Sequence, residues 1–177
     1  MSAPAGEDAA RLASLVADFP DFPRPGVLFK DISPLLADAD AFARVVAAMA
    51  ALAEDVDLVA GVEARGFVVA APAAHAAGRG FVALRKAGKL PGRTLRASYA
   101  LEYATAELEV RPDVVPAGAR VLLVDDVLAT GGTLVAGASL LESCGAQVVR
   151  VAVLLEIAAL GGRAQLAGRE VHALLQA

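Results

Sequence analysis

The chain has 177 residues and a formal net charge of −4 at pH 7, and its mean hydropathy is +0.58. This length fits one domain that buries its own core, and Cys144, the only cysteine, excludes an intrachain disulfide. Alanine accounts for much of the hydropathy, and no apolar run approaches the roughly 20 residues of a membrane-spanning helix. The acidic balance disfavours broad nucleic-acid binding. We therefore expect a soluble single-domain protein with small-molecule ligands and neither a nucleic-acid nor a membrane partner.

The first ten residues, MSAPAGEDAA, carry acidic side chains and no extended apolar stretch. A secretory signal peptide needs a basic region followed by an apolar one. This start predicts a cytoplasmic protein.

An amphipathic helix is the first regular element that the pattern predicts, over residues 38–53. Asp38 is a candidate N-cap, and apolar residues recur after it at helical spacing. These residues are Phe42, Val45, Val46, Met49 and Leu52.

Short apolar runs then indicate buried strands. They lie at 57–62, 80–84, 120–124 and 148–155. Helical stretches at 67–77 and 133–144 follow the first and third runs, and this strand–helix–strand order is typical of a parallel sheet. Residues 94–110 differ, because their polar-flanked pattern predicts two strands of an antiparallel hairpin. Ligands of α/β sheets gather at the carboxyl ends of the strands, where the unusual residues of this sequence also lie.

The stretch VLLVDDVLATGGT (121–133) combines a buried strand with two acids and a loop of small residues. We expect Asp125 and Asp126 to be the first residues outside the sheet and Ala129–Thr133 to turn into a helix beginning near Leu134. Such a turn directs free N–H groups and the positive end of the helix dipole at one point, which suits an anion. Close approach at Gly131 and Gly132 and hydroxyl donors at Thr130 and Thr133 describe a phosphate cup.

The adjacent aspartates need a partner of their own. Two carboxylates roughly 4 Å apart repel by about 4 kcal/mol at an effective dielectric constant of about 20. A sugar diol supplies donors and Mg²⁺ supplies a cation, so the pair beside a phosphate cup indicates a ribose 5-phosphate. The alternative is that the acids are ordinary charges of a first helical turn and the glycines ordinary turn residues. The sequence contains neither a P-loop nor a GxGxxG dinucleotide fingerprint.

With these residues in view, the 121–133 stretch resembles the signature of type I phosphoribosyltransferases. Further motifs follow the adenine phosphoribosyltransferase pattern of that family in order, and together they span nearly the whole chain. They are DFPRPGVLFKDISPLL (21–36), GVEARGF (61–67), RKAGKLPG (85–92) and YALEY (99–103). The resemblance implies the substrates adenine and 5-phosphoribosyl-1-pyrophosphate, the products AMP and pyrophosphate, a requirement for Mg²⁺ bound mainly through the substrate, and a homodimer.

Two motifs are candidates for the pyrophosphate. The resemblance implies a pyrophosphate loop at Glu63, Ala64 and Arg65, often with a cis peptide that would join Glu63 to Ala64. The guanidinium of Arg65 suits a diphosphate and a catalytic role, although an arginine in a surface turn needs no function. The basic residues of the next loop could close over the leaving group, or could belong to a solvated hairpin tip. These residues are Arg85, Lys86 and Lys89, and by resemblance Arg85 reaches the site of the partner subunit.

The base is assigned to two other segments. By resemblance, the carboxylate of Glu102 handles the proton of the adenine ring and the hydroxyl of Tyr103 lies near the reacting centre. In the proline-rich segment 21–36, Leu28 and Phe29 could cover a flat ring, and main-chain groups of Leu28 and Lys30 could read its edge. The same segment could instead be an arm that packs on the core.

We therefore predict one α/β domain over residues 1–177, with a parallel twisted sheet flanked by helices. A small N-terminal hood (about 1–36) and an antiparallel hairpin that includes a mobile catalytic loop (85–103) complete it. The predicted activity is adenine phosphoribosyl transfer in purine salvage. Two alternatives remain open: a phosphoribosyltransferase for hypoxanthine, guanine or xanthine, and a non-catalytic regulator that senses phosphoribosyl pyrophosphate.

Overall fold

The computed structural model describes residues 6–101 and 104–177. Its main sheet has the strand order β5-β6-β4-β3-β7-β8-β9, and the strands from β4 to β9 in this order are parallel. The strands are β3 (Leu58–Val62), β4 (Gly80–Lys86), β5 (Leu95–Leu101), β6 (Ala104–Val110), β7 (Arg120–Leu128), β8 (Gln147–Glu156) and β9 (Glu170–Gln176). The predicted fold class, a parallel sheet flanked by helices, is confirmed.

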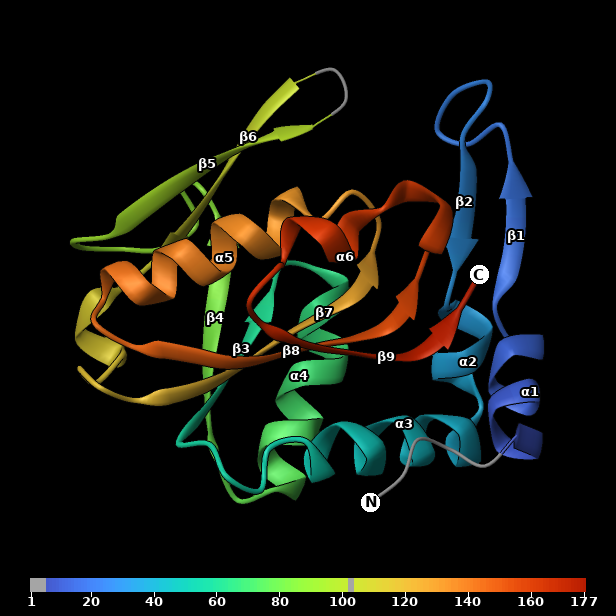
Figure 1. Ribbon diagram of the computed structural model, residues 1–177, viewed down its shortest axis with the longest axis horizontal. Coiled ribbons are helices and arrows are strands. Elements are labelled where there is room, and N and C mark those ends of the chain that lie inside the picture. Colours follow the sequence, from blue (N-terminus) through green and yellow to red (C-terminus); the bar gives the residue numbers. More distant parts are fainter. Residues whose placement is uncertain (1–5, 102–103) are drawn as a thin grey trace.

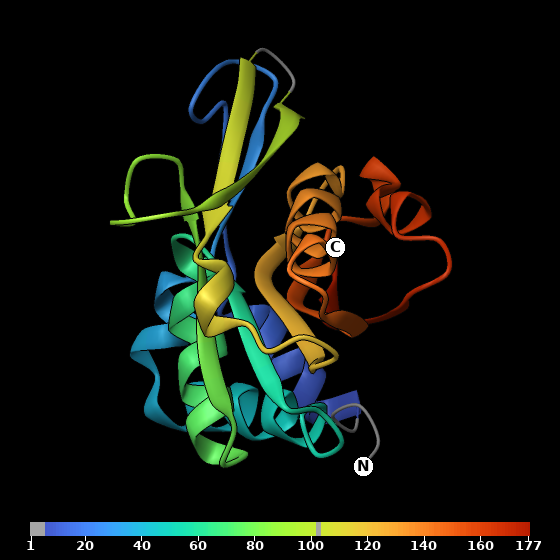
Figure 2. The same ribbon diagram turned by 90° about the vertical axis from the view of Figure 1, so that its left-hand side faces the viewer.

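Helices cover both faces of this sheet. Figure 2 shows α3 and α4 on one side of it and α5 and α6 on the other. The helices are α1 (Gly6–Ser14), α2 (Ser33–Ala37), α3 (Ala39–Ala51), α4 (Arg65–Ala76), α5 (Gly132–Ser143) and α6 (Gly162–Gln165). None in the described part of the chain is long and apolar enough to cross a membrane.

Two hairpins rise above the same edge of the molecule (Figure 1). One is the antiparallel pair β1 (Ala17–Pro20) and β2 (Leu28–Asp31), which forms its own two-stranded sheet. The other is β5 and β6, which pair antiparallel over their whole length and fulfil the expectation for residues 94–110. The two hairpins therefore stand beside the same end of the parallel strands.

The core has two halves, one on each face of the sheet. Leu122 and Val124 of β7 pack in the half under α3 and α4, whereas Val121 and Leu123 pack in the half under α5. Alternate residues of a strand point to opposite faces, so a strand covered on both sides must be apolar throughout. This explains the unbroken apolar run that begins β7.

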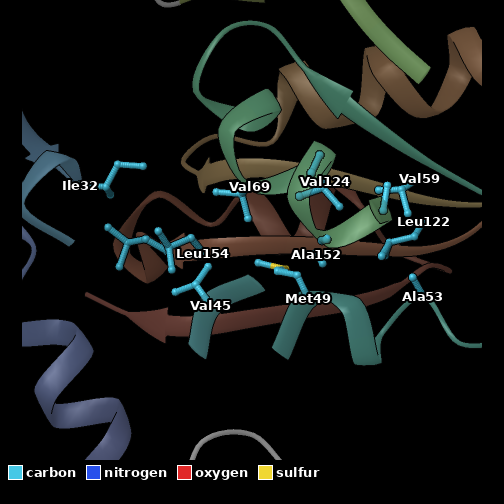
Figure 3. Close-up of a cluster of buried hydrophobic side chains, with 14 of the residues drawn as sticks. Ile32, Val45, Met49, Ala53, Val59, Val69, Leu122, Val124, Ala152 and Leu154 are labelled. Carbon is cyan, nitrogen blue, oxygen red and sulfur yellow. The ribbon is translucent and has the colours of Figure 1, made fainter. Parts of the chain in front are cut away.

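Helix α3 forms where the sequence predicts it. Its N-cap is Asp38, whose Oδ1 accepts a hydrogen bond from the Ala41 N–H at 2.8 Å. Val45 and Met49 point from the helix toward Ala152 and Leu154 of the sheet (Figure 3). Both side chains are fully buried, so packing of this face holds the helix in place.

The structure corrects one boundary that matters for function. Strand β7 continues to Leu128, and Asp125 pairs in register with Val153 of β8. The prediction that the two aspartates lie outside the sheet is therefore wrong. A run of apolar residues ends at Val124, but the backbone ladder does not need apolar side chains in order to continue.

The sequence analysis also missed strands at both ends of the chain. Residues 1–36 were expected to form a small hood, with no strand predicted in it, although β1 and β2 lie there. No strand was assigned to the C-terminal segment, where β9 closes one edge of the sheet. The short apolar-rich run Val171–Leu175, flanked by Glu170 and Gln176, was the available signal for β9.

Candidate active site

The candidate site lies at the carboxyl ends of the central parallel strands. Gly61 of β3 pairs with Val124 of β7, and Val62 pairs with Leu84 of β4. The chain segments that leave these strands therefore begin next to one another. Because these strands are parallel neighbours, residues separated by more than 60 positions converge on one edge.

Asp125 and Asp126 are buried at this edge, with only 8% and 6% of their surface exposed. Asp125 Oδ1 accepts a hydrogen bond from the Asp126 N–H at 2.9 Å. Asp126 Oδ2 lies 2.6 Å from Arg65 Nε, but it accepts no hydrogen bond from the described residues. The pair thus keeps an unsatisfied oxygen in a buried place, which a ligand donor or a cation could satisfy.

Burial, and then the charge of neighbouring Asp126, raises the pKa of the Asp125 carboxyl well above its usual range. The nearby Arg65 offsets part of this effect. Charged groups avoid such places unless a partner compensates them, and a strongly perturbed carboxyl at a strand end is typical of a functional site.

Arg65, the first residue of α4, connects the aspartates to the hood. Its guanidinium carbon lies 4.9 Å from the centre of the Phe29 ring. One terminal nitrogen donates a hydrogen bond to the Lys30 carbonyl at 3.4 Å. A single planar side chain therefore joins the predicted ribose residues with the predicted base residues.

The loop 129–133 turns the end of β7 into α5, as expected. Gly131 is the N-cap of α5 with φ +89°, a conformation that glycine adopts without strain. The loop lines a hollow of about 50 Å³, and the residues around it are Val127, Leu128, Ala129, Thr130, Gly131, Thr133 and Leu134. A hollow at a helix N-terminus suits an anion.

Helix α6 supports this loop, and the sequence analysis did not identify it. A Cβ atom at Gly162 would lie 2.2 Å from the Ala129 carbonyl oxygen and 2.9 Å from the Gly131 nitrogen. Arg163 holds the helix in place, because its Nε donates to Glu156 Oε1 at 3.0 Å and its NH1 to the Val171 carbonyl at 2.7 Å. The pair GG at 161–162 was the only sequence signal for this close approach.

The segment after β3 has the features expected of the pyrophosphate loop. The peptide bond between Glu63 and Ala64 is cis. Glu63 accepts hydrogen bonds from Arg85 Nε and NH2, both at 3.2 Å, and from the Lys86 N–H at 2.8 Å. The structure thus brings Arg85 and Lys86 to this loop within one chain, and their proximity lowers the pKa of Glu63.

Lys89 lies in the turn that joins β4 to β5. Its N–H donates to Glu109 Oε1 at 2.7 Å, and its carbonyl accepts from Arg85 NH1 at 3.4 Å. Its side chain is exposed. A hydrogen bond therefore connects Lys89 of the turn to Arg85 near the end of β4.

The hood presents the predicted base residues near Arg65. Phe29 packs edge-on against Phe22, with 5.2 Å between the ring centroids, and the Leu28 side chain is 49% exposed. The ammonium group of Lys30 is turned to Asp18, at 2.8 Å from Oδ1. Lys30 can therefore offer its main chain, but not its side chain, to a ligand beside Phe29.

Glu102 and Tyr103, to which the proton transfer was assigned, lie outside the described residues. The flanking strands β5 and β6 are described up to Leu101 and from Ala104. Their roles stay predictions.

In the described part of the chain, no three His, Cys, Asp or Glu side chains gather as a metal cage. The aspartate pair still fits a divalent cation, because Asp126 Oδ2 is buried without a hydrogen bond and Mg²⁺ prefers one or two carboxylates together with substrate oxygens. Asp125 and Asp126 are therefore the residues that would face such an ion.

A larger cavity lies elsewhere, between α3 and β9, with a volume of about 550 Å³. Its arginines already have acidic partners: Arg150 pairs with Asp55 and Glu170, and Arg44 with Asp8. Asp126, whose Oδ2 is buried without a hydrogen bond, does not line this cavity.

Comparison with known proteins agrees with this geometry. Residues 34–170 match the model of the phosphoribosyl transferase domain family. The chain belongs to the phosphoribosyltransferase family. Among its relatives, the adenine phosphoribosyltransferase of Kineococcus radiotolerans is 62% identical over 173 residues, which cover 94% of each chain.

Solved phosphoribosyltransferases have the same fold. The adenine phosphoribosyltransferase of Thermoanaerobacter pseudethanolicus superposes with a TM-score of 0.92 at 44% identity, over 96% of this chain and 99% of that one. The Saccharomyces cerevisiae enzyme, solved with an imino-altritol bisphosphate and adenine, gives a TM-score of 0.91 at 34% identity, over 97% and 100% of the two chains. The predicted resemblance to adenine phosphoribosyltransferases is confirmed, and the chain is a pentosyltransferase.

Proposed function

We propose that this protein transfers the 5-phosphoribosyl group of 5-phosphoribosyl-1-pyrophosphate to adenine, forming AMP and pyrophosphate in purine salvage. The observation that carries this proposal is the buried aspartate pair beside the 129–133 hollow, on the edge that also holds the Glu63–Ala64 segment. The adenine phosphoribosyltransferases among its relatives support adenine over another purine.

The loop 129–133 binds the 5-phosphate. Its backbone N–H groups at the start of α5 and the hydroxyls of Thr130 and Thr133 supply the donors. Asp125 and Asp126 accept hydrogen bonds from the ribose hydroxyls, which gives the buried Oδ2 of Asp126 a hydrogen-bond donor. Binding at these groups, remote from the bond that breaks, positions C1′.

The pyrophosphate is held by four cationic side chains and by the main chain of Glu63 and Ala64. The cations are Arg65, Arg85, Lys86 and Lys89. Two of these cations are paired with acids in the structure, Arg65 with Asp126 and Arg85 with Glu63. A diphosphate competes for these arginines, and each exchange frees a carboxylate. Mg²⁺ at Asp125 and Asp126 would add positive charge beside the pyrophosphate oxygens.

Leu28, Phe29 and the main chain of Lys30 hold the adenine ring. The ring nitrogen N9 forms a bond to C1′ while the bond between C1′ and the pyrophosphate oxygen breaks. The carboxylate of Glu102 accepts the proton that the adenine imidazole ring loses, and Tyr103 lies beside the reacting centre. The electron pair of the broken bond leaves with pyrophosphate, so C1′ passes through a state with oxocarbenium character.

The protein acts as a homodimer in the cytoplasm, with a single domain. Val68 and Phe81 are both more than a third exposed, and Phe67, the neighbour of Val68, stacks edge-on with Phe81. These adjoining apolar side chains support a partner surface on α4 and β4. The single cysteine supports a reducing compartment.

The test offers adenine, hypoxanthine, guanine and xanthine separately to the purified protein with phosphoribosyl pyrophosphate and Mg²⁺, and measures nucleotide formation. We expect turnover with adenine, and a loss of at least about 100-fold in kcat/KM for Asp125→Asn/Asp126→Asn. Asp113→Asn, which changes an exposed carboxylate paired with Arg111, is the matched control. Turnover of an oxopurine alone would contradict the base assignment, and no turnover with any base would favour the regulator.

A further inference from the structure

Glu109 of β6 is a fully buried carboxylate, with 0% of its surface exposed. Its Oε1 accepts hydrogen bonds from the N–H groups of Lys89 and Leu90, at 2.7 and 2.8 Å. Its Oε2 accepts from the Thr94 hydroxyl at 3.3 Å and lies 3.3 Å from Arg96 Nε. One side chain thus collects donors from both ends of the turn between β4 and β5.

The sheet fixes the position of this carboxylate. Glu109 pairs in register with Arg85 of β4 on one side and with Arg96 of β5 on the other. The turn itself lies outside the strand ladders, so its N–H groups need another acceptor. A charged acceptor makes stronger hydrogen bonds than a neutral one, and here these bonds lower the pKa of Glu109 although burial alone would raise it.

The same contacts reach the cations assigned to pyrophosphate. The Lys89 carbonyl accepts from Arg85 NH1 at 3.4 Å, and Arg85 in turn pairs with Glu63 beside the cis peptide. The backbone of Lys89, whose side chain is exposed, is therefore held by two contacts: its N–H donates to Glu109 and its carbonyl accepts from Arg85. Besides Glu109, two weaker contacts hold this backbone: the one at the Lys89 carbonyl, and a hydrogen bond from the Ala87 N–H to the Glu107 carbonyl at 3.1 Å.

We propose that Glu109 is a positioning residue, which fixes the turn 88–94 on the sheet so that Lys89 and Arg85 are presented together to the pyrophosphate. The assignment of Lys89 and Arg85 to pyrophosphate rests on the proposed function. The anchoring of the turn by Glu109 does not, and the two parts have separate readouts.

The anchoring is tested by limited digestion with trypsin, followed by mass spectrometry. Trypsin cleaves the Lys89–Leu90 bond, and the two residues that this bond joins donate their N–H groups to Glu109. Cleavage needs an extended chain, so both hydrogen bonds must first break. We expect the Glu109→Gln variant to be cleaved at this bond about tenfold faster than the unchanged protein.

The matched control is Glu107→Gln, the same chemical change two residues earlier on β6. Glu107 accepts a hydrogen bond from the exposed Ser98 hydroxyl at 3.1 Å. We expect cleavage after Lys89 in this variant to equal that of the unchanged protein. Equal cleavage in the Glu109→Gln and Glu107→Gln variants would overturn the anchoring.

The positioning role is tested by steady-state kinetics in both directions. We expect Glu109→Gln to raise the KM for phosphoribosyl pyrophosphate, and for pyrophosphate in the reverse reaction, by about tenfold, because a displaced turn loses contacts to the diphosphate alone. The KM for adenine stays within about twofold. An equal rise for all substrates, or none, would overturn the role.

If Glu109→Gln does not fold, the double variant Thr94→Val/Arg96→Gln decides by the same readouts. This variant removes the Thr94 hydroxyl and the Arg96 guanidinium, two partners of the carboxylate, and leaves Glu109 in place. Thr94 is half-buried and Arg96 is exposed, so both changes are mild for folding. Faster cleavage after Lys89 supports the anchoring, and unchanged cleavage overturns it. The two proposals can fail separately. If the unchanged protein makes no AMP but is cleaved after Lys89 more slowly than the Glu109→Gln variant, the proposed function is overturned and the anchoring stands.

Discussion

At the scale of single residues, the acids and cations of the candidate site neutralise each other. Asp126 lies against Arg65, and Glu63 against Arg85. Asp125 is the exception, because burial and the charge of Asp126 raise its pKa. Holding this carboxyl in the sheet costs stability, which is common where a group is kept for function and not for folding.

Asp125→Asn is therefore expected to stabilise the protein at neutral pH. A folded-state pKa above the unfolded value means that stability is fully present below about pH 4 and is lost as pH rises through the folded pKa. Asparagine removes this loss and keeps the acceptor for the Asp126 N–H. We expect the free energy of unfolding to rise by about 0.5–2 kcal/mol at pH 8, the usual range for a stabilising substitution, and to change little at pH 3.

Urea unfolding of both proteins at the two pH values measures this difference. Asp40→Asn, at an exposed residue of the first turn of α3, is the control and should give no gain. If Asp125→Asn lowers stability at pH 8, the carboxylate is better compensated in the folded state than burial and repulsion indicate.

At the scale of elements, the 129–133 loop depends on a helix that follows it by thirty residues in the chain. The α6 segment fits against the loop only because Gly162 lacks a side chain, and the pair Arg163–Glu156 fixes this helix to β8. The geometry of the 129–133 loop is thus set by tertiary packing as well as by the local sequence GGT.

Gly162→Ala should displace the loop. The added Cβ would lie 2.2 Å from the Ala129 carbonyl oxygen, and backbone cannot move aside as a flexible side chain can. We expect a rise of about tenfold or more in the KM for phosphoribosyl pyrophosphate and a loss of about 1–3 kcal/mol in stability, as for other overpacked sites. Enzyme kinetics and urea unfolding measure the two effects.

Gly80→Ala is the control for this change. A Cβ at Gly80 would meet only the end of the Leu58 side chain, which can turn away. Similar kinetics for the two alanine variants would show that the loop does not depend on the α6 contact.

At the scale of the whole molecule, two buried glutamates and one half-buried glutamate tie distant segments to the sheet. Glu63 holds the end of β4, Glu109 holds the turn 88–94, and Glu156 holds α6 and the end of β9. The pKa of each of these carboxyls is lowered. Their contribution to stability is therefore present above their unfolded pKa of about 4.5 and is lost as pH falls through the folded values.

Replacing Glu156 tests this pH dependence. Arg163, its main partner, is 44% exposed at the side chain, so solvent screens part of the attraction. We expect Glu156→Gln to lose about 1 kcal/mol at pH 7 and to converge with the unchanged protein near pH 3, in urea unfolding between these values. If the free energies of unfolding of the two proteins differ by the same amount at all pH values, the carboxylate charge is not the cause. The control is Glu142→Gln, which changes a carboxylate paired with Arg169 at the surface.

The sequence determined the α/β class, the antiparallel hairpin, the helix behind Asp38 and the turn 129–133 that leads into α5. Each of these depends on local periodicity, a capping side chain or a glycine whose backbone conformation other residues avoid. The same local reasoning placed Asp125 and Asp126 outside the sheet, because the side-chain pattern changes at Val124 although the strand continues to Leu128.

Only the tertiary structure decided which charges meet. The contacts of Arg65 with Asp126 and Phe29, of Arg85 with Glu63, of Glu109 with Lys89 and of Gly162 with Ala129 join positions 20 to 61 residues apart. No local pattern specifies such pairs, because they follow from strand order and from the height at which each strand ends. The sequence by itself therefore determined which residue types gather at the candidate site, and packing of the sheet determined which of their side chains contact one another.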